Sequence, residues 1–197
     1  MTGAAKLVLV DRHGQVINLA QSIGQGGEGT VYAHAQRDDV VAKLYHRPLS
    51  PPRVDKLSAM VQLSNDRLAG ISAWPTEMIF DSRTGLVRGF LMPRITDHEP
   101  IHVLYSPKDR KRQFPDATWA FLVHAALNTA KAVSVLHGNG IVIGDINHDN
   151  VVVSHSATIK LIDCDSFQIR ANGQSFLCEV GVDTHTPPEL QGRSFRE

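Results

Sequence analysis

A polar loop carries an acid and an amide five residues apart, and a second acid follows the next apolar run. Asp145 and Asn150 lie after a long helical pattern and just before the apolar triplet 151–153. Asp163 directly follows a second apolar run, residues 159–162. A turn that uses Asx hydrogen bonds contains the same residue types, but the flanking helix and strand patterns favour a functional loop. The spacing therefore predicts two carboxylates and an amide beside one short strand pair.

These side chains have the chemistry that phosphoryl transfer requires. A carboxylate such as Asp145 can orient a hydroxyl nucleophile and accept its proton. Asn150 and Asp163 offer oxygen ligands for Mg²⁺, a hard cation that proteins hold with few carboxylates, phosphates and water. Asp165 is either a further carboxylate near the metal or a cap for the next turn, and the sequence leaves both readings open.

A glycine-rich segment precedes these acids by more than a hundred residues. It contains Gly24, Gln25, Gly26, Gly27 and Gly29, and a β-branched pair ending at Val31 follows it. Glycines let the backbone approach phosphates closely and direct N–H groups at them, because no Cβ intervenes. A tight β-turn uses the same residues, so the glycines alone are a weak signal. No helical pattern begins at Gly29, which argues against a dinucleotide-binding fold.

Lys43 lies in the apolar run 40–45, where an unpaired ammonium would be costly. One interpretation is a phosphate-binding lysine. The alternative is a surface lysine on an edge strand.

In this order, the glycine loop with Val31, Ala42-Lys43, the loop from Asp145 to Asn150, and Asp163 resemble the protein-kinase motifs. The resemblance covers residues 20–192. It implies an α+β, two-lobed protein-kinase-like fold. Residues 1–95 would form a β-rich N-lobe with one helix, and residues 96–197 a helical C-lobe that is truncated.

The resemblance also implies ATP and Mg²⁺ as cofactors. Asp145 and Lys43 would be catalytic, and the metal ligands would be Asn150, Asp163 and Asp165. The implied nucleotide-binding residues are Gly24, Gln25, Gly26, Gly27, Gly29, Val31, Ala42, Lys43, Met92 and Arg94. Pro93, in the implied hinge, cannot donate a backbone hydrogen bond to an adenine.

The chain departs from the family pattern at the glutamate that pairs with the lysine. No glutamate lies between Lys43 and Pro75. The replacement could be Asp55, Gln62 or Glu77, and the sequence leaves the choice open.

Two further departures concern the catalytic and metal motifs. Ile143-Gly144 replaces the usual His-Arg pair, so regulation by a phosphate on the activation segment is not expected. Cys164-Asp165 replaces Phe-Gly, which removes a flexible hinge, and Cys164 is expected to be a small buried side chain rather than a reactive thiol.

The segments 161–168 and 186–192 are especially similar to bacterial Ser/Thr kinase-like proteins of the tellurite-resistance and stress-associated group. This subgroup implies a metal-dependent phosphatase and a von Willebrand A-type protein as possible partners. In the kinase family further helices follow this point, so Leu122, Leu127 and Val133 of the long helical pattern are expected to leave apolar surface uncovered.

Composition excludes several other classes. Twenty basic and twenty acidic residues balance, so neither nucleic acid nor an anionic membrane is an expected partner. The start of the chain lacks a signal-peptide core, and two cysteines without a C-x-x-C spacing favour a cytoplasmic protein. Ten histidines occur without an H-E-x-x-H pattern, so no histidine metal site is expected.

Three functions remain open. The first is an ATP- and Mg²⁺-dependent Ser/Thr protein kinase acting on a protein substrate. The second is a catalytically weak nucleotide-binding pseudokinase or regulatory module. The third is a small-molecule phosphotransferase, because Gly144-Asp145 with His148 and Asn150 is similar to the catalytic loop of aminoglycoside-type kinases.

Overall fold

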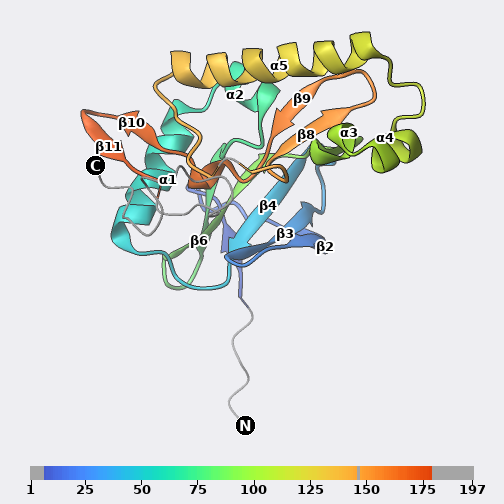
Figure 1. Ribbon diagram of the computed structural model, residues 1–197. Helices are drawn as coiled ribbons and strands as arrows, with labels where there is room; N and C mark the ends of the chain where they lie inside the picture. Colours follow the sequence, from blue (N-terminus) through green and yellow to red (C-terminus); the bar gives the residue numbers. More distant parts are fainter. Residues whose placement is uncertain (1–6, 146, 179–197) are drawn as a thin grey trace. The chain divides into compact units, whose positions relative to one another are not determined.

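The computed structural model describes residues 7–145 and 147–178 (Figure 1). By their internal contacts these residues form two compact units. The first comprises residues up to 64 together with 74–94, and the second comprises 65–73 together with the residues from 95 onward. The expected boundary at residue 95 lies within one residue of this division, whereas 65–73 join the second unit.

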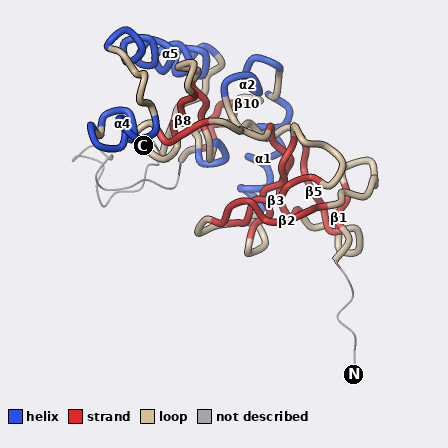
Figure 2. The backbone as a smooth tube through the Cα atoms, turned by 90° about the vertical axis from the view of Figure 1, so that its right-hand side faces the viewer, coloured by secondary structure: helices blue, strands red, loops and turns tan. Residues whose placement is uncertain are grey.

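The first unit is built on a six-stranded antiparallel sheet in the order β1-β5-β6-β4-β3-β2 (Figures 1 and 2). Its strands are β1 Leu9–Val10, β2 Leu19–Gln25, β3 Gly29–His34, β4 Val40–Tyr45, β5 Glu77–Asp81 and β6 Val87–Pro93. In the turn before β2, Gly14 has a positive φ of 80°, which favours glycine.

One helix belongs to this unit, α1 Pro51–Leu63. Pro51 and Pro52 begin it, because proline is tolerated in a first turn whose N–H groups have no helical partner. Leu57 and the half-buried Val54 pack with Tyr45 and Phe90 of the sheet. This cluster is one of two apolar layers, and the other lies against the opposite face.

The second unit contains helices and short strands. They are α2 Asp66–Ile71, β7 His98–Pro100, α3 His102–Tyr105, α4 Pro107–Gln113, α5 Trp119–Gly138, β8 Val151–Ser154, β9 Ile159–Leu161, the 3-10 turn η1 Cys164–Ser166, β10 Ile169–Ala171 and β11 Gln174–Phe176. The strands form a three-stranded sheet β7-β8-β9 and a separate hairpin β10-β11.

Helix α5 packs along α2 and β9 (Figure 1). It begins at the Thr118 cap, whose hydroxyl accepts from the Phe121 N–H at 3.3 Å, and it buries Ala125, Ala132 and Leu136. Its length and hydropathy would allow it to cross a membrane, a test that the core helices of soluble proteins also pass. On the packed side, Lys160 of β9 donates to the Gly70 carbonyl near the end of α2, and burial lowers the pKa of this lysine.

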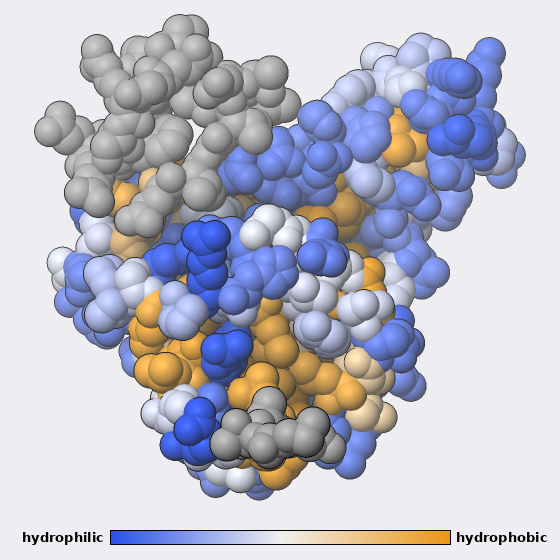
Figure 3. Space-filling view, turned by 90° about the horizontal axis from the view of Figure 1, so that it is seen from below, coloured by the Kyte–Doolittle hydropathy of each residue, from blue (hydrophilic) through white to orange (hydrophobic). Residues whose placement is uncertain are grey.

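Apolar surface is also visible when the molecule is viewed from below (Figure 3). In the first unit the exposed large apolar side chains are Leu7, Val8, Val16, Ile23 and Leu86.

Candidate active site

Lys43 lies on an interior strand. β4 is hydrogen-bonded to β3 on one side and to β6 on the other. The residue is only 9% exposed, and its Nζ lies 5.9 Å from the centre of the Tyr45 ring and 6.0 Å from that of Phe90. Aromatic faces at this distance stabilise a cation. The alternative of a surface lysine on an edge strand is therefore wrong.

The strand register decides which side chains accompany Lys43. Val31 and Phe90 are its direct cross-strand partners, and Val41 and Met92 pair two positions along the same strands. Because side chains alternate across a strand, these residues share one face.

Ala42 points to the other face. It is fully buried in the apolar cluster with Val40, Ile79 and Leu91. The expectation that Ala42 and Lys43 line one nucleotide site is therefore wrong, because neighbouring residues of a strand point to opposite sides. Val41 is the neighbour that shares the face of Lys43.

The register also rules out one expected partner for Lys43. Glu77 pairs with Leu91, one position from Phe90, so it lies on the face opposite Lys43. The Oε1 of Glu77 lies 3.6 Å from the Nε of Arg12 instead. The other two candidates, Asp55 and Gln62, are exposed on α1.

Helix α1 has no glutamate to pair with Lys43. Instead, its Arg53 forms an ion pair with the glycine loop. Arg53 lies 2.6 Å from the Glu28 carboxylate at the tip of the loop. The guanidinium also lies 5.5 Å from the centre of the Tyr45 ring. The sequence did not indicate this pair, because its two residues are far apart in the chain and either one alone is an ordinary surface charge.

The glycine loop is the tip of the β2-β3 hairpin, as the absence of a helical pattern predicted. The N–H of Gly26 donates to the Gly29 carbonyl at 2.9 Å and closes the turn. A Cβ on Gly29 would lie 2.6 Å from the Leu44 carbonyl oxygen, so this glycine is required by the close approach of β4. A Cβ on Gly24 or Gly27 would meet no described atom within 4 Å, which leaves the backbone there accessible.

In the second unit, Asp145 and Asn150 are in direct contact. The Nδ2 of Asn150 donates to the carbonyl of Asp145 at 3.0 Å and to its Oδ2 at 3.3 Å. Asn147 donates to the same Oδ2 at 3.2 Å. Asp145 Oδ1 is buried and has no hydrogen-bond partner among the described residues. A buried carboxylate oxygen is normally satisfied, so this atom is suited to a hydroxyl donor from outside the chain.

The Asx turn that was the alternative for this loop is present, but a different residue forms it. Asn147 Oδ1 accepts from the N–H groups of Asp149 at 2.8 Å and Asn150 at 3.1 Å. The side chains of Asp145 and Asn150 take no part in the hydrogen bonds of this turn. Because Asn150 donates its amide N–H₂ to Asp145, its amide oxygen points away from this contact and is available to bind a hard cation such as Mg²⁺.

Asp163 lies two residues after the end of β9, directly before η1, in a left-handed conformation with φ 56°. Its carbonyl accepts from Ser166 Oγ at 2.9 Å, and the 3-10 turn η1 follows at once. Asp165 lies within this turn and has no positive φ, so a glycine is not needed there. Cys164 is 1% exposed, as expected for a packing residue.

Gly144 is in contact with Cys178. A Cβ on this glycine would overlap both Cβ and Sγ of Cys178. The space that a side chain would need before Asp145 is thus filled by a residue from beyond the β10-β11 hairpin. The expected segment at 186–189 lies outside the described residues.

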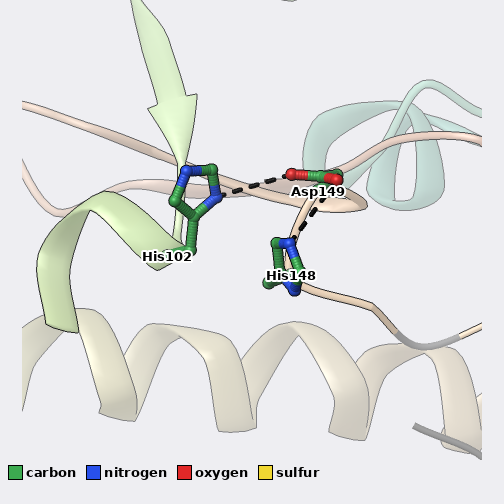
Figure 4. Close-up of side chains that lie close together, drawn as sticks. All are labelled: His102, His148 and Asp149. Atoms are coloured by element: carbon green, nitrogen blue, oxygen red, sulfur yellow. Dashed lines mark ion pairs between the residues drawn. The ribbon is translucent and has the colours of Figure 1, made fainter. Parts of the chain in front are cut away.

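One group of potential ligands was not expected from the sequence. His102, His148 and Asp149 each place one ligand atom within 4.8 Å of the others (Figure 4). The pairing of β7 with β8 brings His102 to the loop, and no local motif indicates this pairing. A cavity of about 260 Å³ between α2, α5 and β9 contains none of these candidate residues.

Comparison with solved structures identifies the architecture. The ROP18 kinase domain in complex with AMP-PNP and sucrose superposes with a TM-score of 0.64 at 16% identity, covering 96% of this chain and 62% of that one. The fold is protein-kinase-like.

Sequence comparison agrees with the fold. "Protein kinase YegI" of Escherichia coli K12 is 43% identical over 178 residues, and the protein of the same name from E. coli O157:H7 is 41% identical over 186. The alignments cover 90% and 94% of this chain but 28% and 29% of the relatives. A "Probable SapB synthase" of Streptomyces coelicolor is 25% identical over 160 residues, 74% of this chain and 17% of that protein. No family model matches. These relatives and the fold support a place for the chain in the protein-kinase-like superfamily.

Proposed function

We propose that this chain binds ATP with Mg²⁺ and transfers the γ-phosphate to a hydroxyl acceptor, as a Ser/Thr-directed protein kinase. The observation that carries the proposal is the geometry of Asp145. Its Oδ2 is held by Asn147 and Asn150, while its buried Oδ1 has no partner among the described residues. An acceptor hydroxyl that donates to Oδ1 would be oriented for attack and would lose its proton to the carboxylate.

The residues present fit the cofactors. The open backbone at Gly24 and Gly27 and the ammonium of Lys43 suit phosphate oxygens. Val31, Val41 and Met92 supply apolar surface on the same face as Lys43. The amide oxygen of Asn150 and the carboxylate of Asp163 would hold Mg²⁺, with Asp165 as a further candidate. When bound, Mg²⁺ neutralises charge that develops on the phosphates.

Relatives and the structural neighbour support the kinase-like part of the proposal. The two relatives from Escherichia coli are named protein kinases, and the ROP18 domain was solved with AMP-PNP. This chain spans less than a third of the length of the relatives. We therefore propose, rather than conclude, that the substrate is a protein and that Arg94 lies near the adenine. The proposal also includes a cytoplasmic location and membership of the tellurite-resistance subgroup, with a metal-dependent phosphatase and a von Willebrand A-type protein as partners.

A nucleotide-binding regulatory module is the second candidate. It is favoured by α1, which presents the exposed Asp55 and Gln62 where the kinase family has a glutamate for the lysine. Binding and chemistry must therefore be tested separately.

Nucleotide binding is measured first, by thermal shift with millimolar ATP in the presence and absence of Mg²⁺. A ligand that binds only the folded state raises the melting temperature by mass action. Asp163→Ala should lose the Mg²⁺-dependent part of the shift. Asp38→Asn, an exposed acid in the turn before β4, is the matched control and should behave as wild type. Absence of any Mg-ATP shift in wild type would refute the proposal.

Phosphoryl transfer is measured second, with γ-labelled ATP and a panel of protein and small hydroxyl acceptors. Asp145→Asn should keep the Mg-ATP thermal shift and lose transfer by about 10²–10⁴-fold, the usual contribution of a general base. Equal transfer by wild type and Asp145→Asn would refute the role of Asp145. A normal thermal shift without transfer by wild type would favour the regulatory module.

A further inference from the structure

The cluster of His102, His148 and Asp149 lies next to the Asp145–Asn150 pair but uses different side chains. His102 begins α3, and His148 and Asp149 occupy the loop between Asp145 and Asn150 (Figure 4). The Nδ1 of His102 lies 3.4 Å from Asp149 Oδ1, and the Nε2 of His148 lies 3.6 Å from Asp149 Oδ2. The two imidazole rings meet edge to face, with centroids 5.1 Å apart.

We propose that His102, His148 and Asp149 bind a transition-metal cation, with Zn²⁺ as the best match. Two imidazoles and one carboxylate favour zinc and its neighbours over Mg²⁺, which prefers oxygen ligands alone. Three protein ligands leave the fourth tetrahedral position for water or another ligand. This site is separate from the oxygen ligands proposed for Mg²⁺, and it does not depend on ATP binding.

The distances agree with ligands around one ion. A tetrahedral zinc with bonds of about 2.0–2.2 Å places neighbouring ligand atoms roughly 3.3–3.6 Å apart. The separations of 3.4 Å from His102 Nδ1 and 3.6 Å from His148 Nε2 fall in this range, and they reach the two different oxygens of the Asp149 carboxylate. One ligand atom from each residue lies within 4.8 Å of the others, and the exposed Asp149 side chain has room to turn toward a common centre.

The contact between His102 and Asp149 is not that of an ordinary hydrogen-bonded ion pair. His102 Nδ1 is buried and makes no hydrogen bond with any described residue, although the Asp149 carboxylate lies beside it. A buried imidazole nitrogen is normally satisfied by a donor or acceptor. A cation between the nitrogen and the carboxylate would satisfy both atoms at the observed separation.

The backbone holds the ligands in place before any metal binds. Pro100 of β7 pairs with Val152 of β8, and the N–H of Ile101 donates to the Val151 carbonyl at 2.8 Å. His102 follows this ladder directly. On the other side, Asp149 is fixed by its N–H, which donates to Asn147 Oδ1 at 2.8 Å. A preorganised site loses less entropy on binding and binds more tightly.

The test is calorimetric titration of the whole chain with Zn²⁺ in excess Mg²⁺, so that sites for hard cations are already filled. One zinc per chain is expected. His102→Ala and the near-isosteric Asp149→Asn should each weaken binding at least about tenfold. His124→Ala removes an exposed histidine of α5 and should bind zinc as wild type does.

Co²⁺ serves as a spectroscopic probe of the ligand set. Nitrogen and oxygen ligands give visible d–d bands without the near-ultraviolet charge-transfer band of a thiolate, which separates this site from the two cysteines. Metal-free melting temperatures check that the variants fold. Absence of zinc binding by wild type, equal binding by wild type, His102→Ala and Asp149→Asn, or a thiolate band with Co²⁺ would overturn the proposal.

Discussion

Gly144, directly before the proposed catalytic Asp145, is a glycine because of its neighbour. A Cβ at this position would overlap Cβ and Sγ of Cys178. Cys178 has a short side chain, so it has no flexible end that could move aside. The absence of an arginine there is thus part of the packing around the loop. Position 144 therefore supplies no basic side chain that could bind a phosphate.

We expect Gly144→Ala to lower the free energy of unfolding by about 1–3 kcal/mol, the usual cost of inserting a methyl group into a packed site. Gly138→Ala is the matched control, because a Cβ there meets no described atom within 4 Å. It should be neutral or slightly stabilising, since alanine favours a helix more than glycine does. Chemical denaturation measures both. Equal free energies of unfolding for the two variants would show that Cys178 can move aside without destabilising the fold.

At the scale of single elements, the β2-β3 hairpin is held at its tip by side chains of its own unit. His46, just after β4, contacts Thr30 Oγ1 at 2.9 Å and the Gly27 carbonyl at 3.3 Å. Arg53 of α1 contacts Glu28 at the same tip. Glycine-rich backbone has high conformational entropy, so these contacts reduce the motion of a loop proposed to bind phosphate.

His46→Ala should therefore loosen the tip without unfolding the sheet. A hydrogen bond contributes about 1 kcal/mol net, so losing these contacts should speed amide exchange at residues 25–28 by about five- to tenfold. Exchange in β4 and β6 should not change. Hydrogen–deuterium exchange with mass spectrometry measures both segments. His34→Ala, near the other end of β3, is the control, and an equal increase in both variants would contradict a local role for His46.

At the scale of the whole molecule, α5 exposes a row of large apolar side chains. Trp119 is 79% exposed, and Val123 and Leu127 are each 50% exposed. Their spacing of four residues places them in one stripe along the helix. Of the side chains expected to be uncovered, Leu127 is exposed, while Leu122 and Val133 are half-buried.

We expect this stripe to make the chain self-associate or bind a partner. Replacing Val123 and Leu127 together by glutamine should weaken self-association at least about tenfold, since a buried large aliphatic side chain contributes about 1.5–3 kcal/mol. Light scattering over a range of concentrations measures it. His124→Gln, exposed on the same helix, should associate as wild type does. A monodisperse wild-type monomer with a cooperative, high-temperature unfolding transition would contradict the prediction.

Local sequence determined the elements and the order of the chemical groups. The 3.6-residue periodicity of α5, the apolar runs of β4, β6, β8 and β9, and the need for a positive φ at Gly14 are properties of neighbouring residues. Asn172-Gly173 is a further local signal, the hairpin turn between β10 and β11 with φ of 51° and 76°. The kinase-like fold could be expected from the ordered motifs, because each motif is short and contiguous.

Tertiary structure decided every question that depends on which segments pair. Strand register placed Ala42 and Glu77 on the face opposite Lys43, because a shift of one residue exchanges the two faces of a strand. The β7-β8 pairing brought His102 to His148 and Asp149, and packing brought Cys178 to Gly144. Such contacts join residues distant in the chain and depend on the packing of the whole unit, so no local pattern of residues determines them.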